Sequence, residues 1–549
     1  MKKSDPAVEL RAFALALADA IDERAVDDEI DIAQLKLELA QTLQLGIFPK
    51  NAALLSALPI ARRTPAVMAA LRTRLTRTAS GVSPIALMPK PLPCPGECTY
   101  CPSAMRVETA PDGTRHPALF APKSYTGFEP ATMRAIQNDY DARKQIEVRL
   151  AQFEALGQPT DKCELIIMGG TFLSAPEPYR SQFIQECYEA MNGEENSTGL
   201  MAGAQSLNES APHRVIGLTI ETRPDWCQKS HIDTILSWGA TRVELGVQSL
   251  DDEVLARVKR GHKVSETIRA TTDLKNSAYK VGYHYMPGLY STHAQDVSSM
   301  RRLFTDSSFC PDMLKLYPCL VMAGTGLYEE WKAGRFAPID AAEAVSRIAD
   351  ATPYFPPWVR VMRMQRDIPA DKISAGVKNG NLHQMVMDEM KARGERCRCI
   401  RCREVFQPHR RDEGAKRIPL RLSLVEREYP ASGGIEHFIS YEDEEQDLLA
   451  GFIRLRLESK SHRSEIGFRT ALIRELHVYG QEVLIGQKGE ENGIQVQHAG
   501  LGKSLLSRAE EIAREAGGEK MAILSGVGVR PYYEKLGYTR EGPYMAKKL

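Results

Sequence analysis

The stretch CPGECTYC, residues Cys94–Cys101, places three cysteines within eight positions at the spacing C-x3-C-x2-C. A structural zinc ion in a protein usually has four protein ligands. In a 4Fe–4S cluster each iron takes one ligand, so three cysteines leave one iron open. The spacing therefore predicts an iron–sulfur cluster that accepts an outside ligand, with a structural zinc site as the alternative.

Short apolar runs alternate with helical patterns between about residues 85 and 320. The expected strands are Ile85–Met88, Glu164–Met168, Val215–Ile220, Val243–Val247, Val281–Met286 and Leu314–Tyr317. The expected helices are Ala131–Leu156, Glu177–Met191, Ile232–Ser237 and Ser265–Lys275. Such repeated units predict a parallel sheet, open or curled into a barrel, with ligands at the carboxyl ends of its strands. The polar segment Gly193–His213 is expected to be a mobile loop.

The chain of 549 residues is too long for a single core, so several domains are expected. Apolar residues at helical spacing predict a helical region over 1–80. The parallel-sheet domain is expected over 81–320 and a helical, cysteine-rich connector over 321–417. Strands around one clear helix predict a separate α+β domain over 418–549.

Positive charge is segregated although the chain has 71 basic and 71 acidic residues. No Asp or Glu occurs from Leu39 to Gly96, and a second basic run extends from Lys391 to Arg421. Two such runs favour a polyanionic partner, because contacts to phosphates release counterions, although a solvated helix face is the alternative. The candidate contacts are Arg62, Arg63, Arg72, Arg74 and Arg77.

The N-terminal stretch MKKSDPAVEL has no apolar export signal, and no run reaches transmembrane length. Eleven cysteines without such a signal indicate a reducing compartment, the cytoplasm, where clustered cysteines more often bind metals than form disulfides.

A second cysteine cluster, Cys397, Cys399 and Cys402, lies in the connector. With a fourth cysteine it predicts a structural zinc site that ties the connector to the barrel. Cys310 is preferred over Cys319 as the fourth ligand because it lies in an expected loop; unligated thiols are the alternative. The remaining cysteines, expected to be buried and apolar, are Cys163, Cys187, Cys227 and Cys319.

The first cysteine motif resembles that of the radical S-adenosylmethionine (SAM) superfamily, in which SAM chelates the open iron and yields a 5′-deoxyadenosyl radical. Tyr100 precedes the third cysteine, as is usual there, and Gly169-Gly170-Thr171 resembles that family's turn against the methionine moiety. An ordinary tight turn is the alternative. At the ends of the third and fourth expected strands, the candidate SAM contacts, or else core-edge polar residues, are Glu221, Arg223 and Gln248.

The C-terminal region resembles the Gcn5-related acetyltransferase fold. There, Q-x-x-G-x-G before the helix Ser504–Arg514 would offer free amides to the pyrophosphate of acetyl-CoA. The resemblance implies contacts from Gln497, Gly500, Leu501, Gly502 and Lys503, and pantetheine contacts from Glu475, Leu476, His477 and Val478. Tyr532 and Tyr533 would lie near the thioester sulfur, where a phenol can donate a proton, or else pack as aromatic residues.

The fusion of these two domains, with KSYTGFEPATMRAIQNDYD, MGGTF and GLTIETRPDWC, resembles the family of the catalytic third subunit of Elongator from about Pro59 to Leu549. The resemblance implies a partial (β/α)6 TIM-like barrel and a tRNA carboxymethyltransferase. Its members use acetyl-CoA and SAM to modify carbon-5 of the wobble uridine in the anticodon stem-loop. Lys162 matches a family lysine near acetyl-CoA; the alternative is a solvated lysine at the end of a strand. The same two interpretations apply to Lys280, at the start of another expected strand.

Two other functions fit parts of the sequence. A protein lysine N-acetyltransferase would use the iron–sulfur cluster only structurally, but its basic substrates would be repelled by the acid-free segment. A tRNA-binding scaffold with degenerate sites is disfavoured by the intact C-x3-C-x2-C and Q-x-x-G-x-G patterns. The sequence leaves a homodimer open and does not imply further subunits.

Overall fold

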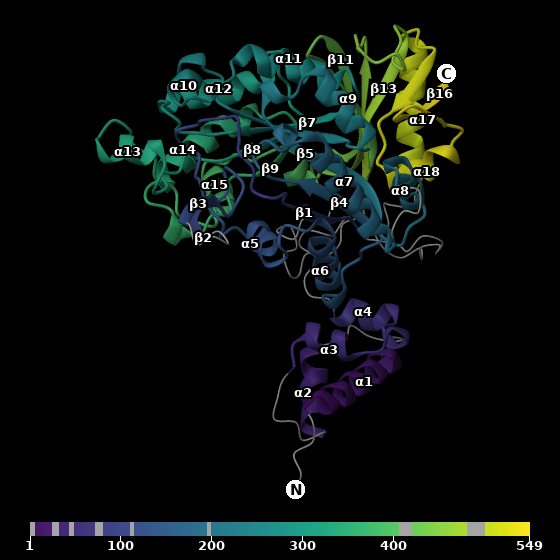
Figure 1. The fold of residues 1–549 in the computed structure, drawn as a ribbon. Coiled ribbons are helices and arrows are strands. Elements are labelled where there is room, and N and C mark those ends of the chain that lie inside the picture. The colour runs from purple at the N-terminus through teal and green to yellow at the C-terminus, as the bar shows by residue number, and fades with distance from the viewer. Residues whose placement is uncertain are drawn as a thin grey trace.

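The computed structural model describes residues 6–24, 32–42, 49–71, 81–109, 115–194, 199–405, 420–479 and 500–549. Within them a helical N-terminal unit, a half-barrel and a second mixed sheet follow one another along the chain (Figure 1). The α/β fold class and the order of units predicted from the sequence are confirmed.

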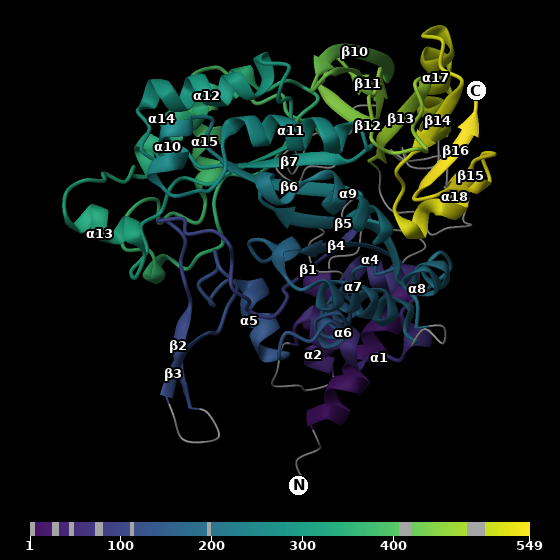
Figure 2. The ribbon, with the colours of Figure 1, turned by 45° about the horizontal axis from the view of Figure 1, so that its top comes forward.

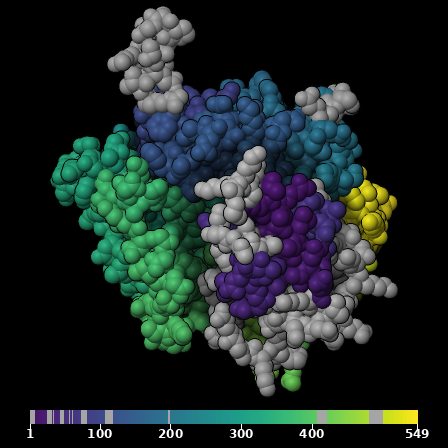
Figure 3. Space-filling view, turned by 90° about the horizontal axis from the view of Figure 1, so that it is seen from below, coloured from purple at the N-terminus to yellow at the C-terminus, as the bar shows by residue number. Residues whose placement is uncertain are grey.

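The N-terminal unit consists of α1 (Pro6–Arg24), α2 (Ile32–Thr42), α3 (Asn51–Ala57) and α4 (Pro65–Leu71). These helices bury their own small apolar core, which includes Phe13, Leu17 and Leu54. Seen from below, the molecular surface is hollowed between these purple helices and the green part of the chain (Figure 3).

The half-barrel is a seven-stranded sheet of order β1-β4-β5-β6-β7-β8-β9 in which every neighbouring pair is parallel. Its strands are β1 (Ser83–Leu87), β4 (Lys162–Ile167), β5 (Arg214–Thr222), β6 (Arg242–Gln248), β7 (Lys280–Tyr285), β8 (Met313–Leu316) and β9 (Arg360–Arg363). All six expected strands are present. The sheet also continues past residue 320 through β9, whose sequence RVMR is too short and too basic to show an apolar run.

Helices cover the outside of the half-barrel, and a hairpin of β2 (Met105–Thr109) and β3 (Arg115–Leu119) projects from it (Figure 2). The helices in the first half are α5 (Pro130–Gln137), α6 (Ala142–Ala155), α7 (Glu177–Asn192), α8 (Met201–Asn208), α9 (Lys229–Ser237) and α10 (Asp252–Arg257). Those in the second half are α11 (Val264–Lys275), α12 (His293–Thr305), α13 (Gly326–Lys332), α14 (Ala341–Ala351), α15 (Leu382–Ala392) and α16 (Ile400–Arg403).

Two expectations about these helices are wrong. The single helix expected over Ala131–Leu156 is broken between α5 and α6, where Asp139 and Tyr140 have positive φ. The segment expected to be a mobile loop contains α8, because its polar residues find buried partners. The Asn208 side chain accepts a hydrogen bond from Val215 N at 2.7 Å, and Gln205 donates one to Ser237 O at 2.8 Å.

The C-terminal sheet has the order β10-β11-β12-β13-β14-β16-β15. Its elements are β10 (Ser423–Ala431), β11 (Gly434–Asp443), β12 (Leu448–Leu457), β13 (Thr470–Val478), α17 (Leu501–Glu515), β14 (Lys520–Ile523), α18 (Arg530–Glu534), β15 (Thr539–Glu541) and β16 (Tyr544–Lys548). Only β13 and β14 are parallel, and their pairing ends at Ile473 and Ile523. Because β13 continues to Val478, its last residues extend beyond β14 and pair, within the described residues, with β12.

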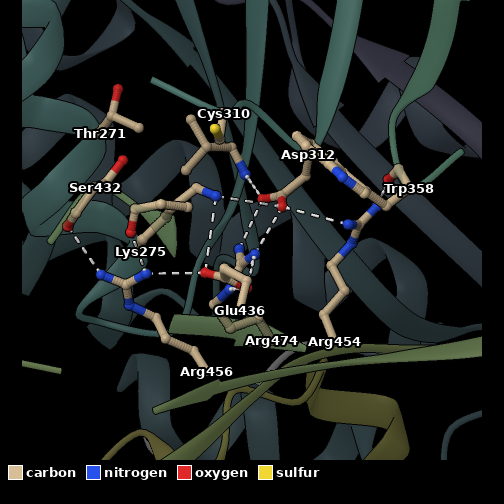
Figure 4. A network of polar contacts seen from close by, with 12 residues as sticks. Thr271, Lys275, Cys310, Asp312, Trp358, Ser432, Glu436, Arg454, Arg456 and Arg474 are labelled. Carbon is tan, nitrogen blue, oxygen red and sulfur yellow. Dashed lines mark hydrogen bonds and ion pairs between the residues drawn. The ribbon is translucent and has the colours of Figure 1, made fainter. Parts of the chain in front are cut away.

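The C-terminal sheet docks on the amino ends of the barrel strands through a buried ionic network (Figure 4). Arg474 of β13 donates two 2.7 Å hydrogen bonds to Asp312, which directly precedes β8. Arg474 also pairs with Glu436 at 2.7 Å, and all three side chains are essentially inaccessible. A Cβ on Gly526 would lie 2.0 Å from Ile216 O, so the two domains also meet backbone to backbone. The two domains are therefore in close contact, and buried ion pairs fix their relative position.

Candidate functional site

The loop that contains the first cysteine motif follows β1, at the carboxyl end of the barrel. Cys98 Sγ accepts a hydrogen bond from Arg260 at 3.4 Å, Cys101 Sγ lies 3.2 Å from Ser124 Oγ, and Cys94 Sγ lies 3.6 Å from Thr171 Oγ1. Three separate segments of the barrel rim thus contact one thiol each.

The spread of these thiols separates the two metal hypotheses. Four thiolates around one zinc ion lie about 3.8 Å apart, since Zn–S bonds are about 2.3 Å long in a tetrahedron. In the described part of the chain, Cys94, Cys98 and Cys101 are not among the groups whose ligand atoms all lie within 4.8 Å of one another. Thiolates that bind three different irons must be further apart, so the motif fits a cluster better than a single ion.

The candidate SAM contacts surround this loop. Gly169 and Gly170 follow β4 with φ of +123° and +68°, and a Cβ on Gly170 would meet Lys123 O at 2.9 Å. Glycine is required here, because the left-handed backbone and the close approach of Lys123 O leave no room for a side chain. Glu221 and Gln248 end β5 and β6, as expected, and Gln248 has a left-handed backbone with φ of +70°.

Buried polar atoms without partners also point to a ligand in this region. Among the described residues, the buried atoms left without a hydrogen bond include Arg223 Nη1 and Arg260 Nε. Burial, Arg260 and Arg223 lower the pKa of His262 to about 2, so its ring is neutral. Such orphaned groups are costly unless a polar molecule satisfies them. His262 and Arg260 were not expected from the sequence, although the basic run KRGHK follows the carboxyl end of β6.

A second polar cluster lies inside the barrel below this rim. Lys315 of β8 pairs with Glu244 and lies 3.6 Å from Glu221, and His284 Nε2 lies 2.9 Å from Glu244 Oε2. Tyr125 donates a 3.0 Å hydrogen bond to Glu221. Burial raises the pKa of Glu244, but Lys315 and His284 together lower it well below its usual value. The carboxylates of this cluster are therefore charged, and the neighbouring Lys315 offsets their charge.

The lysines expected near acetyl-CoA lie at the other end of the barrel. Lys162 begins β4, with its Nζ 3.9 Å from Asp161, and Lys280 begins β7. Both therefore face the C-terminal domain, away from the first cysteine motif.

The expected acetyl-CoA residues converge in the C-terminal domain. A Cβ on Gly502, in the first turn of α17, would lie 3.3 Å from Tyr532 Oη and 3.8 Å from Val478 Cγ2. The first amides of α17 have no partner within the helix. The region between this turn and the end of β13, Glu475–Val478, is called the slot below. Of the other expected contacts, Leu501 and Lys503 lie in the same turn, and Gln497 lies outside the described residues.

The two tyrosines differ in position. Tyr532 is 36% exposed and lies beside the turn of Gly502, whereas Tyr533 is buried in the core of the domain. Burial raises the pKa of both phenols, so each remains protonated and able to donate. Only Tyr532 is placed to reach a ligand in the slot.

The connector cysteines form a compact group. The sulfur atoms of Cys397, Cys399 and Cys402 all lie within 4.8 Å of one another, as a single zinc ion requires. Cys310 does not join them, because its Sγ lies 3.8 Å from Asp306 O and Pro430 O instead. The prediction of Cys310 as the fourth ligand is therefore wrong. Cys319, the other candidate, packs beside Tyr100 in a separate apolar cluster. The cysteines predicted to be buried are confirmed as such: Cys163, Cys187, Cys227 and Cys319.

The basic N-terminal residues are only partly described. Arg62 pairs with Asp19 of α1, and Arg63 donates to Leu58 O at 3.2 Å. The remaining candidates, Arg72, Arg74 and Arg77, lie outside the described residues.

The comparisons with known proteins agree with this layout. A model of the radical SAM superfamily matches residues 93–304, and one of the radical SAM C-terminal domain matches 311–392. The tRNA uridine(34) acetyltransferase of Methanocaldococcus infernus is 44% identical, over 95% of this chain and 96% of its own length. Elongator complex protein 3 of Homo sapiens is 40% identical, over 95% of this chain and 94% of its own length. The chain belongs to the Elongator complex protein 3 family.

A solved structure of the same family supports the fold. The archaeal Methanocaldococcus infernus Elp3 with an N-terminal deletion superposes with a TM-score of 0.74 at 42% identity, covering 86% of this chain and all of that one. The match to the C-terminal radical SAM model also explains why the sheet continues through β9 after residue 320. Among the described helices of this family member, none has the length and apolar character to cross a membrane.

Proposed function

We propose that this protein is a radical SAM acyltransferase that installs a carboxymethyl group on carbon-5 of the wobble uridine of tRNA, using acetyl-CoA. The observation that supports this most directly is the presence of two candidate sites at the two ends of one barrel. A three-cysteine loop lies at the carboxyl ends of the barrel strands, and the residues that resemble an acetyltransferase site belong to the domain docked at their amino ends. Two relatives named tRNA uridine(34) acetyltransferase are 44% and 43% identical over 95% and 98% of this chain.

In this proposal Cys94, Cys98 and Cys101 hold a 4Fe–4S cluster whose fourth iron is left for SAM. The bound pair supplies a radical able to take hydrogen from an unactivated carbon. The chain itself would orient SAM through the backbone of Gly169 and Gly170. The polar groups of the rim, among them Arg223, Glu221 and Gln248, would bind the charged and polar parts of SAM and keep water away from the reacting atoms.

Acetyl-CoA would bind in the slot between β13 and α17. Its pantetheine amides would pair with the backbone of Glu475–Val478, and its pyrophosphate would accept hydrogen bonds from the first turn of α17. Tyr532 would donate a proton to the departing thiolate, while Tyr533 supports it from the core. Lys162 and Lys280 would lie at the mouth between this slot and the barrel.

We further propose that Cys397, Cys399 and Cys402 hold a structural zinc ion in the connector. The thiolates of both metal sites require a reducing environment, so we place the protein in the cytoplasm. The RNA partner would be the anticodon stem-loop, whose unpaired bases can leave their stack to enter a protein cleft. Basic residues of the N-terminal unit, Arg62, Arg63, Arg72, Arg74 and Arg77, would contact its phosphates.

The test is mass spectrometry of nucleosides from tRNA incubated with the protein, acetyl-CoA, SAM and a reductant. We expect carboxymethyluridine at the wobble position, and none with Cys98→Ala. A protein lysine N-acetyltransferase would instead transfer acetyl groups to basic peptides, leave tRNA unmodified and be indifferent to Cys98→Ala. That outcome would replace the proposal; the names of the relatives favour tRNA.

A further inference from the structure

A surface pocket lies at the rim of the barrel beside the first cysteine motif. It is formed by residues that follow β8 and β9 and by the start of α5, and its volume is about 340 Å³. This is near the lower limit for ligand pockets, so it suits one planar ring better than a large cofactor. None of the residues assigned above to the cluster, SAM, acetyl-CoA or zinc lines it.

The pocket combines an aromatic surface with an apolar floor. Phe128 lines the pocket and is 42% exposed, so part of its ring is accessible. The floor contains Ile368, Ile373 and Leu382, all of which are buried. A flat apolar ligand could therefore stack on the ring and rest against aliphatic side chains.

The rim of the pocket is cationic. Lys372 Nζ lies 4.2 Å from the centre of the Phe128 ring and 3.2 Å from Asp371, and Arg366 and Lys378 line the pocket. Asp367 also lines it, but this carboxylate is paired with Arg363. A ring with positive charges around it is the combination by which proteins bind unpaired nucleotides, because bases stack and phosphates are neutralised.

The pocket is close to the proposed reaction site. Arg366 donates a hydrogen bond to Ser124 O, and Ser124 Oγ lies 3.2 Å from Cys101 Sγ. Pro318 and Leu320 of the pocket follow Tyr317, which lies over His284 inside the barrel with ring centres 5.3 Å apart. A base that enters the barrel mouth would therefore have its neighbours in the strand at this rim.

We propose that this pocket binds an unpaired nucleotide of the anticodon loop next to the target uridine, stacking its base on Phe128. The inference rests on the proposed function and adds to it a site that fixes the register of the RNA. Stacking of one base on an aromatic side chain is sequence-tolerant, so the pocket would position the loop without selecting its sequence.

The experiment measures binding of an anticodon stem-loop RNA to the full-length protein, by fluorescence anisotropy, for Phe128→Ala and for a matched control, Met133→Ala. Met133 is a similarly exposed apolar residue, 45% exposed, in α5, which begins two residues after Phe128, and it does not line the pocket. We expect binding to weaken about 5-fold to 100-fold for Phe128→Ala, as for the loss of one stacked base, and to stay within twofold for the control.

RNAs with a single abasic loop position identify the stacked base. One abasic position should weaken binding to the unaltered protein as much as Phe128→Ala does, and should have no further effect on that variant. Lys378→Gln should reduce the salt dependence of the RNA-binding constant by the equivalent of about one phosphate contact. The same substitution at Lys535, an exposed and distant lysine, should leave that salt dependence unchanged.

Three results would overturn the inference. The first is that Phe128→Ala binds RNA as tightly as Met133→Ala does. The second is that the loss of affinity caused by the abasic position adds to the loss caused by Phe128→Ala. The third is that Phe128→Ala loses thermal stability while its RNA affinity is unchanged, as expected if the pocket holds an apolar peptide. Each differs from failure of the proposed function, in which the unaltered protein itself forms no carboxymethyluridine.

Discussion

Neutralising the buried carboxylate of Asp312 is the strongest test of how the two domains are joined. This carboxylate accepts both hydrogen bonds from Arg474, lies 3.6 Å from Arg454 and 3.7 Å from Lys275, and is completely inaccessible. The surrounding network contains four cations, Lys275, Arg454, Arg456 and Arg474, against the carboxylates of Asp312, Glu436 and Glu475. Asp312→Asn leaves four cations with two carboxylates.

The expected cost of this substitution is about 3–5 kcal/mol, because it leaves buried charge without compensation. The amide oxygen of asparagine can still accept the 2.9 Å hydrogen bond from Val281 N, so the loss reports charge rather than the backbone contact. The matched control is Glu426→Gln, in an exposed pair with Arg508 at 2.6 Å, which should cost at most about 1 kcal/mol.

The assay is urea unfolding followed by fluorescence, with calorimetry to resolve the two domains. Asp312→Asn should destabilise their joint transition, and adding Arg474→Gln should recover part of the loss, since the double variant removes one surplus cation. Burial raises the pKa of Asp312, but Arg474, Lys275 and Arg454 lower it far below normal. The stability it contributes is therefore full above about pH 4 and declines at lower pH. A loss no larger than that of Glu426→Gln, or one that does not change below pH 4, would refute this reasoning.

The other predictions concern the sites themselves. Cys94→Ala should abolish the absorbance of the iron–sulfur cluster and the release of 5′-deoxyadenosine. Cys397→Ser should lower the zinc content but keep the cluster absorbance and the 5′-deoxyadenosine release. Loss of zinc but not of iron in Cys94→Ala would contradict the assignment. Tyr532→Phe should lower tRNA-stimulated thiol release from acetyl-CoA about 100-fold or more, and Tyr533→Phe should stay within about threefold, because only Tyr532 reaches the slot. Burial lowers the pKa of His477 to about 4, so the folded chain favours the neutral ring. Unfolding free energy should thus fall by up to about 3 kcal/mol as the pH drops from 6.5 to 4, and His477→Gln should remove that part of the slope measured by urea unfolding.

Most of the architecture could be predicted because its determinants are local. Apolar runs of β-branched residues mark β4 to β8, and the cysteine spacing marks the cluster loop. Elements whose stability comes from distant partners could not be found in this way. The strand β9 is polar and is held by β8, and α8 depends on Asn208 and on Gln205, which also contacts Arg530 of the C-terminal domain.

The errors at the sites have the same physical origin. The choice of Cys310 as a zinc ligand assumed that a loop near the connector would turn towards it, but its neighbour Asp312 is fixed by Arg474, and the thiol faces Pro430. Sequence also could not rank Tyr532 against Tyr533, since neighbours on one short helix differ only in which face they present to the core. His262 and Arg260 were missed because they are buried, and Arg260 donates a hydrogen bond to Cys98, only in the folded chain.

The placement of the two sites at opposite ends of one sheet constrains how they cooperate. The strand β7 has six residues, so the barrel is about 20 Å long from its amino to its carboxyl end. The end of β13 faces the amino end: Lys280 and Glu164 both act on the pKa of His477, and Arg360 donates a 3.0 Å hydrogen bond to Tyr479. Under the proposed function, an acetyl group held there would have to cross the length of the barrel to meet a radical formed at its rim. The charged cluster of Lys315, Glu244 and Glu221 lies inside the barrel, so we propose that the two half-reactions are joined in this polar interior.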